Sequence, residues 1–294
     1  MLDNVAAASL THGIGHVVLS VADVAAARGF YKSVGLNEAR GERWPAGGNS
    51  IVFRLENGQA LVLAEGPVAS DRELSAAHVA LAMTPAAREK VRATGLQVFD
   101  YREDRPAEAD DNFYLVDPSG NRIQIVARDD SGPAGRIDHV AIEVSDIMWA
   151  EAFYGDGMGW PILHRVGWST NDYLRAKAKG EAGMKDAMPG SRYINERYSQ
   201  FEKERRAVRP NPQLYFDTGA GCTVAVYLAS RHYTAPPDRQ RVGVPCLGLR
   251  AAVALDRVAS VLEKFRMPLE VAPAGKSLFF RDLGGNFVEF TSGA

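Results

Sequence analysis

Residues 14–23 read IGHVVLSVAD, and residues 137–146 read IDHVAIEVSD. A Phe-Tyr pair follows each segment at the same offset, as Phe30-Tyr31 and as Phe153-Tyr154. An internal repeat of this kind is typical of a duplicated structural unit. The chain is therefore predicted to repeat a unit in which a strand is followed by a helix, with a histidine in each opening strand.

The two histidines, His16 and His139, occupy matched positions in these strands. Side chains alternate between the two faces of a strand, so Val17 and Leu19 point away from His16. The apolar row can pack beneath the following helix, which leaves each histidine on the open face of a sheet. The recurrence favours metal binding by at least one of them, and the alternative is a hydrogen-bonded strand histidine without a ligand.

Length and charge set the class of protein. A chain of 294 residues can form two compact domains. Its 34 Lys and Arg are dispersed among 36 Asp and Glu and form no basic stripe, so we expect no nucleic-acid partner. We find no signal peptide and no membrane-spanning segment, and the two cysteines form no disulfide framework. We expect a cytoplasmic protein with no membrane partner.

The pattern of a strand, a helix and three further strands occurs four times, opening near residues 14, 77, 137 and 246. The helices are predicted at 23–35, 85–94, 146–155 and 255–265. The strands that complete the units are predicted at 38–44, 50–55, 60–63, 97–101, 112–116, 122–127, 161–166, 214–216, 223–228, 278–281 and 287–291.

A polar segment at 129–135, DDSGPAG, is the clearest linker. It predicts one domain at 12–128 and a second at 136–294. The second domain contains a charged insertion at 170–212, and a segment of this length in a compact domain is usually functional or disordered. The aromatic residues of the insertion favour either a lid over the substrate or an arm that contacts a second subunit in a homo-oligomer. The third interpretation is a surface segment without either role. The candidate substrate contacts are Tyr193, Tyr198 and Phe201.

The second and fourth units close on related motifs, DPSGNRIQ at 117–124 and DLGGNFVE at 282–289. Four units with these opening strands and closing turns resemble the vicinal oxygen chelate superfamily, which includes glyoxalase I, bleomycin-resistance proteins, methylmalonyl-CoA epimerase and type I extradiol dioxygenases. The resemblance covers the chain apart from its first dozen residues and the insertion. It implies an α+β fold of four βαβββ modules, paired into two cup-shaped mixed sheets, with a divalent metal that chelates two neighbouring substrate oxygens.

The resemblance also implies metal ligands in each cup. Modules 1 and 2 would supply His16, His78 and Gln124, and modules 3 and 4 would supply His139 and Glu289, with Cys246 in place of a second histidine. Each cup departs from the family pattern. An amide oxygen neutralises none of a cation's charge, and a free cysteine more often packs as a small apolar side chain.

Three further residues are candidates for catalysis. Glu143 and Arg250 are predicted to face the cup of modules 3 and 4, where Arg250 would bind a substrate carboxylate or phenolate, or else pair with Glu143. Tyr114 stands at the position of a tyrosine that ring-cleaving extradiol enzymes carry. Neither cup has the full set of dioxygenase residues.

The leading expectation is a metal-dependent enzyme, an extradiol-type dioxygenase that cleaves a small catechol-like compound with Fe(II) or Mn(II). One alternative is a glyoxalase- or epimerase-like lyase or isomerase, for which Zn(II) or Ni(II) is also suitable, with proton transfer by a carboxylate such as Glu289 or Glu143. A non-catalytic protein that sequesters a small molecule is the other alternative.

Overall fold

The computed structural model describes residues 8–42, 44, 49–68, 77–98, 112–132, 135–144, 146–166, 213–228, 246–271, 275–282 and 284–292. The insertion at 170–212 lies outside the described residues, and so do Tyr193, Tyr198 and Phe201. No helix in the described part is long and apolar enough to cross a membrane.

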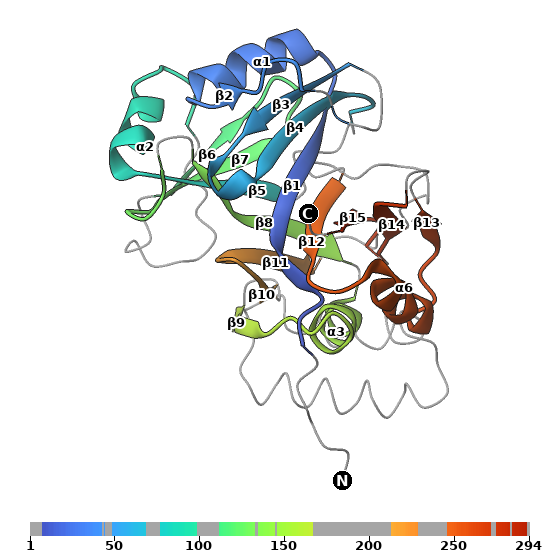
Figure 1. The fold of residues 1–294 in the computed structure, drawn as a ribbon. Helices are drawn as coiled ribbons and strands as arrows, with labels where there is room; N and C mark the ends of the chain where they lie inside the picture. The colour runs from blue at the N-terminus through green and yellow to red at the C-terminus, as the bar shows by residue number, and fades with distance from the viewer. Residues whose placement is uncertain are drawn as a thin grey trace.

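Four units follow one another along the chain (Figure 1). Unit 1 contains β1 (Thr11–Val21), α1 (Val24–Ser33), β2 (Asn37–Glu38), β3 (Ser50–Arg54), the 3₁₀ turn η1 (Glu56–Gly58) and β4 (Ala60–Glu65). Unit 2 contains β5 (His78–Met83), α2 (Pro85–Arg92), β6 (Phe113–Val116) and β7 (Arg122–Ala127). Unit 3 contains β8 (Arg136–Val144), α3 (Ile147–Ala150), the π-helical turn η4 (Glu151–Gly157), β9 (Ile162–Val166), β10 (Gln213–Gly219) and β11 (Cys222–Leu228). Unit 4 contains β12 (Cys246–Ala251), α6 (Leu255–Lys264), β13 (Leu269–Val271), β14 (Ser277–Arg281) and β15 (Phe287–Thr291).

Side-chain caps fix where the repeated helices begin. The Asp23 carboxylate accepts hydrogen bonds from the backbone N–H groups of Ala25 and Ala26. Asp146 does the same for Met148 and Trp149 at the start of α3. An aspartate at this position satisfies N–H groups that have no partner within the helix. The aspartate that follows each opening strand, in VAD at 21–23 and in VSD at 144–146, therefore starts a helix in both copies.

The strands form two sheets, ordered β13-β14-β15-β12-β1-β4-β3-β2 and β6-β7-β5-β8-β11-β10-β9. Unit 1 thus shares a sheet with unit 4, and unit 2 with unit 3, through antiparallel pairing of β1 with β12 and of β5 with β8. The expected pairing of modules 1 with 2 and 3 with 4 is wrong at the level of the sheets. The connection from β7 to β8 covers only residues 128–135, which keeps unit 3 in the sheet of unit 2, where β5 lies between these two strands.

One face of each sheet lies in a common hydrophobic core with the helices. Val17 and Leu19 of β1 and Val140 and Ile142 of β8 belong to this core and are almost completely buried. The opposite face of the first sheet carries a separate apolar cluster around Val18. The opposite face of the second sheet carries another, formed by Ala141, Tyr215, Ala225 and Tyr227. The alternation of side chains therefore separates a structural face from a candidate functional face, as predicted.

The closing turns attach one sheet to the other. Tyr31 in α1 donates a hydrogen bond to Asp117 in the turn of unit 2, at 3.1 Å. Tyr154 in η4 donates to Asp282 in the turn of unit 4, at 2.8 Å. In the same turns, Asn121 donates to the backbone oxygen of Ser20, and Asn286 to that of Glu143. The repeated Phe-Tyr and Asp-x-x-Gly-Asn motifs thus bind one another and join the two units within each half of the chain.

Candidate metal sites in the two sheets

The sheet pairing regroups the predicted metal ligands. His16, Cys246 and Glu289 lie on β1, β12 and β15 of the first sheet. The other three, His78, His139 and Gln124, lie on β5, β8 and β7 of the second sheet. The expected grouping of His139 with Glu289 is therefore wrong, because these residues belong to different sheets. Each of the six residues lies with ligand candidates from another strand.

The first cluster brings three different donor atoms together. One ligand atom each from His16, Cys246 and Glu289 lies within 4.8 Å of the other two, and all three residues are buried. His16 Nε2 is 2.9 Å from Glu289 Oε2. Register explains the contact, because Gly248 is paired with His16 on one side and with Glu289 on the other.

Gly248 gives the His16 ring its place. A Cβ atom added to Gly248 would lie 2.0 Å from His16 Cε1 and 2.1 Å from Nε2. The imidazole therefore lies across the backbone of β12 at the one residue type without a side chain. This path carries the ring over the intervening strand to the carboxylate of Glu289.

Apolar and aromatic groups surround the first cluster. The Trp44 ring centroid is 4.3 Å from that of His16. Phe287, two residues before Glu289, packs with Trp44 and Cys246 in the apolar cluster of this face. Burial raises the pKa of Cys246 well above its ordinary value, and the charge of Glu289 adds to this effect while Arg281 opposes it. The thiol is therefore protonated unless a cation takes its place, since a metal ion deprotonates a coordinating thiol.

The second cluster has a different geometry. His78 Nε2 is 3.1 Å from His139 Nε2, so the two imidazoles face each other directly. Here Ala80 takes the place that Gly248 has in the first sheet, between His139 and Gln124. Its methyl group stands where the corresponding ring would cross the strand, so His139 turns toward His78 rather than toward Gln124.

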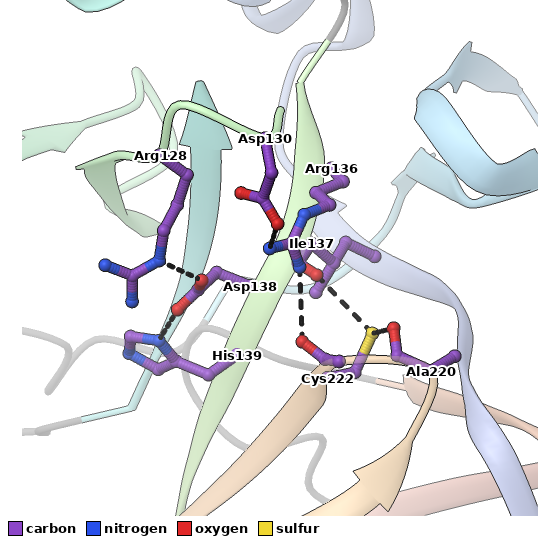
Figure 2. Close-up of polar contacts among 9 residues, drawn as sticks. Arg128, Asp130, Arg136, Ile137, Asp138, His139, Ala220 and Cys222 are labelled. Atoms are coloured by element: carbon purple, nitrogen blue, oxygen red, sulfur yellow. Dashed lines mark hydrogen bonds and ion pairs between the residues drawn. The ribbon is translucent and has the colours of Figure 1, made fainter. Parts of the chain in front are cut away.

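Asp138 and Arg128 orient His139 (Figure 2). The His139 Nδ1 atom is 2.9 Å from Asp138 Oδ2, and Arg128 Nε is 3.1 Å from Asp138 Oδ1. Burial raises the pKa of Asp138, but the hydrogen bond and charge of His139 and the charge of Arg128 outweigh burial, so the pKa is lowered overall. The ionised carboxylate can only accept, so Nδ1 of His139 donates to it and Nε2 points toward His78. The sequence analysis missed Asp138, although an aspartate directly before the repeated histidine was visible in IDHVAIEVSD.

Gln124 completes this second cluster. Its Oε1 atom is buried and has no hydrogen-bond partner among the described residues. Tyr114, paired with Gln124 in the sheet, presents its ring edge-on to His78 at a centroid distance of 5.2 Å. Tyr114 thus lies beside two candidate ligands, and its catalytic role stays a prediction.

Comparisons with known proteins agree with this architecture. No family model and no curated protein sequence matches the chain. Among solved structures, a candidate dioxygenase from Bacillus subtilis superposes with a TM-score of 0.61 at 13% identity, covering 97% of this chain and 86% of that one. Glyoxalase I from Zea mays gives 0.57 at 14% identity, covering 95% and 92%. The cppA protein from Streptococcus pneumoniae gives 0.50 at 9% identity, covering 97% and 99%.

The chain has the vicinal oxygen chelate fold. Three βαβββ units and a second unit that is βαββ within the described residues form two mixed sheets, which confirms the α+β class expected from the sequence. Sequence identities of 9–14% to these structures show that the fold is shared, and they do not assign an activity to this chain.

Within this vicinal oxygen chelate fold, the two clusters differ in how well they suit a divalent cation. A thiolate at Cys246 and a carboxylate at Glu289 would together supply two negative charges, and His16 would supply a neutral imidazole. Imidazole, thiolate and carboxylate are common ligands of zinc and iron. The second cluster offers only neutral donors, two imidazoles and an amide, and would leave the charge of the ion uncompensated. The chemistry of the donors therefore favours the first cluster.

Two other predicted site residues, Glu143 and Arg250, lie in different sheets. Glu143 is buried on β8 and is paired with Tyr227 in the second sheet. Arg250 lies on β12 in the first sheet, and its Nη2 donates to the backbone oxygen of Asn57 at 3.1 Å. The expectation that both face one cup is wrong, because their strands belong to different sheets.

Proposed function

We propose that the protein is a metal-dependent enzyme that cleaves a small catechol-like compound oxidatively at the His16–Cys246–Glu289 cluster. One observation carries the proposal: a ligand atom from each of these side chains lies within 4.8 Å of the others on the open face of the first sheet. The fold shared with a candidate dioxygenase supports the same reaction class.

The number of ligands favours this reaction. In the sheet, His16 is paired with Ala60 on β4, and Val18 with Val62, so β4 adds no donor beside the cluster. Three protein ligands leave three positions of an octahedral ion open. An iron(II) or manganese(II) ion held by these residues would supply a centre at which two adjacent substrate oxygens and dioxygen can meet. In such a cleavage one ring carbon–carbon bond breaks, both oxygen atoms of dioxygen enter the product, and no separate reductant is consumed.

The protein's own side chains would set the conditions for this chemistry. The buried carboxylate of Glu289 holds the His16 ring through Nε2, which aligns two donors before an ion arrives. Trp44 and the apolar cluster around Val18 exclude water and present flat surfaces suited to an aromatic ring. Exclusion of water strengthens the electrostatic interactions of the bound substrate.

A second candidate is proton transfer of the glyoxalase or epimerase kind, which the fold shared with glyoxalase I suggests. The position of Glu289 favours it, because a carboxylate beside the substrate's carbon could act as the base. This reaction would use the same ion and consume no oxygen.

The test begins with metal analysis of protein purified without chelator. We expect about one iron or manganese ion per chain, and we expect Glu289→Gln to weaken metal affinity more than about 100-fold, since loss of even an outer partner costs 10- to 100-fold. His139→Ala, at the matched position of the second sheet, is the control and should keep the metal.

Oxygen uptake then separates the candidate reactions. Stoichiometric consumption of oxygen with a panel of catechols and hydroquinones supports oxidative cleavage. Turnover of a 2-oxoaldehyde hemithioacetal without oxygen uptake supports the second candidate. Tight binding of catechol by metal-free protein, with no turnover in air, would contradict both and support a sequestering protein.

A further inference from the structure

Arg281 lies on the same face as the first cluster. In the pairing of β14 with β15, Arg281 is opposite Phe287 and Phe279 is opposite Glu289. Residues directly opposite in a sheet project from the same face. Arg281 is therefore one cross-strand pair removed from the carboxylate of Glu289, with Phe287 between its strand and the strand of Cys246.

The guanidinium of Arg281 extends over an aromatic surface. Its Cζ is 4.8 Å from the centroid of the Phe287 ring, and Phe287 stacks on Phe279 with an interplanar angle of 12°. The two nearly parallel rings therefore stack beside the guanidinium, on the face that carries the cluster. A cation above a ring is attracted to its negative face, which holds the guanidinium in this position.

Arg281 lacks a carboxylate partner within the described ranges. Seven other described arginines each pair with one: Arg28, Arg54, Arg88, Arg92, Arg128, Arg136 and Arg165. Arg281 makes a single long hydrogen bond, from Nη1 to the backbone oxygen of Gly285 at 3.4 Å. Glu270, which is opposite Phe279, is exposed. A half-buried cation with unused donors beside a metal cluster is suited to an anionic ligand.

We propose that Arg281 binds the carboxylate of an aromatic diol whose two oxygens lie at the His16–Cys246–Glu289 cluster. The proposal rests on the proposed function and narrows its substrate to carboxylated catechols. Neighbouring strands lie about 4.8 Å apart, so β14 and β12 are about 10 Å apart with β15 between them. The guanidinium already covers part of this span over Phe287. A benzene ring beside this aromatic pair would span the remainder, with its diol at one end and its carboxylate at the other.

Binding under anaerobic conditions tests the proposal without turnover. Calorimetry on the metal-loaded protein should show 3,4-dihydroxybenzoate binding about 10- to 100-fold more tightly than catechol, the range expected for hydrogen bonds to a charged group. Arg281→Met should remove this preference and leave the affinity for catechol unchanged, and Arg281→Lys should retain part of it. Arg54→Met, in the same sheet and paired with Glu42, is the control and should keep the preference.

Two results would overturn the assignment. Equal binding of both ligands by the wild-type protein would show that no anion is recognised here, while metal content and oxygen uptake with neutral catechols would still support the metal-dependent reaction. Loss of metal from Arg281→Met with an unchanged ligand preference would show that the arginine acts on the cluster instead of on the substrate.

Discussion

The two candidate metal sites differ in the residue paired with the histidine: Gly248 has no side chain, whereas Ala80 has a methyl group. His16 and His139 stand at matched positions of their strands, and each is paired with a small residue, Gly248 or Ala80. Over Gly248 the imidazole crosses the strand and reaches Glu289. Beside Ala80 the ring turns back to the neighbouring histidine. The residue paired with each histidine, Gly248 or Ala80, thus determines which side chain the imidazole contacts.

Gly248→Ala should therefore damage the first site more than the fold. The added methyl would overlap the His16 ring and force it away from Glu289, at a cost of about 1–3 kcal/mol in the free energy of unfolding, the usual range for overpacking. Urea denaturation measures this cost, and metal analysis should show loss of the bound ion. Ala80→Gly, at the matched position of the second sheet, is the control and should keep the metal. An ion retained at wild-type affinity in Gly248→Ala would exclude a positioning role for the glycine.

At the residue level, the sequence predicts which face a side chain occupies but not which residues meet there. Alternation along each strand placed His16, His139 and Glu289 on open faces, because the opposite positions are apolar. Their grouping depends on strand pairing, which alternation does not encode. Trp44 was missed for the same reason, since it reaches His16 from a segment between β2 and β3. Arg281 was missed although its strand pairs directly with the strand of Glu289.

At the level of elements, the closing turns connect the repeated motifs. The Asp117 carboxylate accepts hydrogen bonds from the backbone of Ser119 and Asn121, from the Asn121 amide and from Tyr31. One buried carboxylate thus fixes the turn and attaches it to helix α1. Asp282 fixes the matching turn in unit 4 and attaches it to η4.

Asp117 should make the folded protein more stable as the pH falls, the opposite of the usual effect of an aspartate. Burial raises its pKa above the ordinary 3.8, although hydrogen bonds from Asn121, Ser119 and Tyr31 favour the charged form. The folded protein therefore binds a proton at Asp117 more tightly than the unfolded chain does. The resulting contribution to the free energy of unfolding is fully present below the ordinary pKa and is lost as the pH rises through the raised pKa of the folded protein. The free energy of unfolding of the wild type, minus that of Asp117→Asn, should increase between pH 7 and pH 4.

Urea denaturation at several pH values measures this difference. Asp129→Asn, which changes an exposed carboxylate in the linker, is the control and should follow the wild type across the range. A difference that stays flat or falls on acidification would mean that the hydrogen bonds outweigh burial at Asp117.

Most elements could be predicted because their signals are local. The predicted bounds of β7, β12 and β15 match the structure, and Asp23 caps α1 as expected. Two differences have non-local causes. Within the described residues, the strand expected at 38–44 is limited to β2, which pairs with β3 at the edge of the sheet. The helix expected at 146–155 changes to a π-helical turn where Phe153 and Tyr154 pack into the core.

At the scale of the whole molecule, the two sheets do not correspond to the two halves of the sequence. Each half is joined internally by a closing turn, but each sheet takes one unit from either half. The four opening strands have similar patterns of apolar and small residues, so any two could pair. The order of the strands follows from the short β7–β8 connection and from the packing of both sheets on a common core. The predicted linker at 129–135 lies between β7 and β8, which belong to the same sheet.

The halves of the chain should accordingly fail to fold alone. A fragment of residues 1–128 would expose the edge of β1 that pairs with β12 and the edge of β5 that pairs with β8, and a fragment of residues 136–294 would expose the complementary edges. Unpaired central strands with buried apolar faces favour aggregation. Each fragment expressed separately should be insoluble or lack a cooperative thermal transition, whereas the two expressed together should form a complex with the circular dichroism of the intact chain. Independent cooperative folding of either fragment would contradict this assembly and restore the contiguous domains at 12–128 and 136–294.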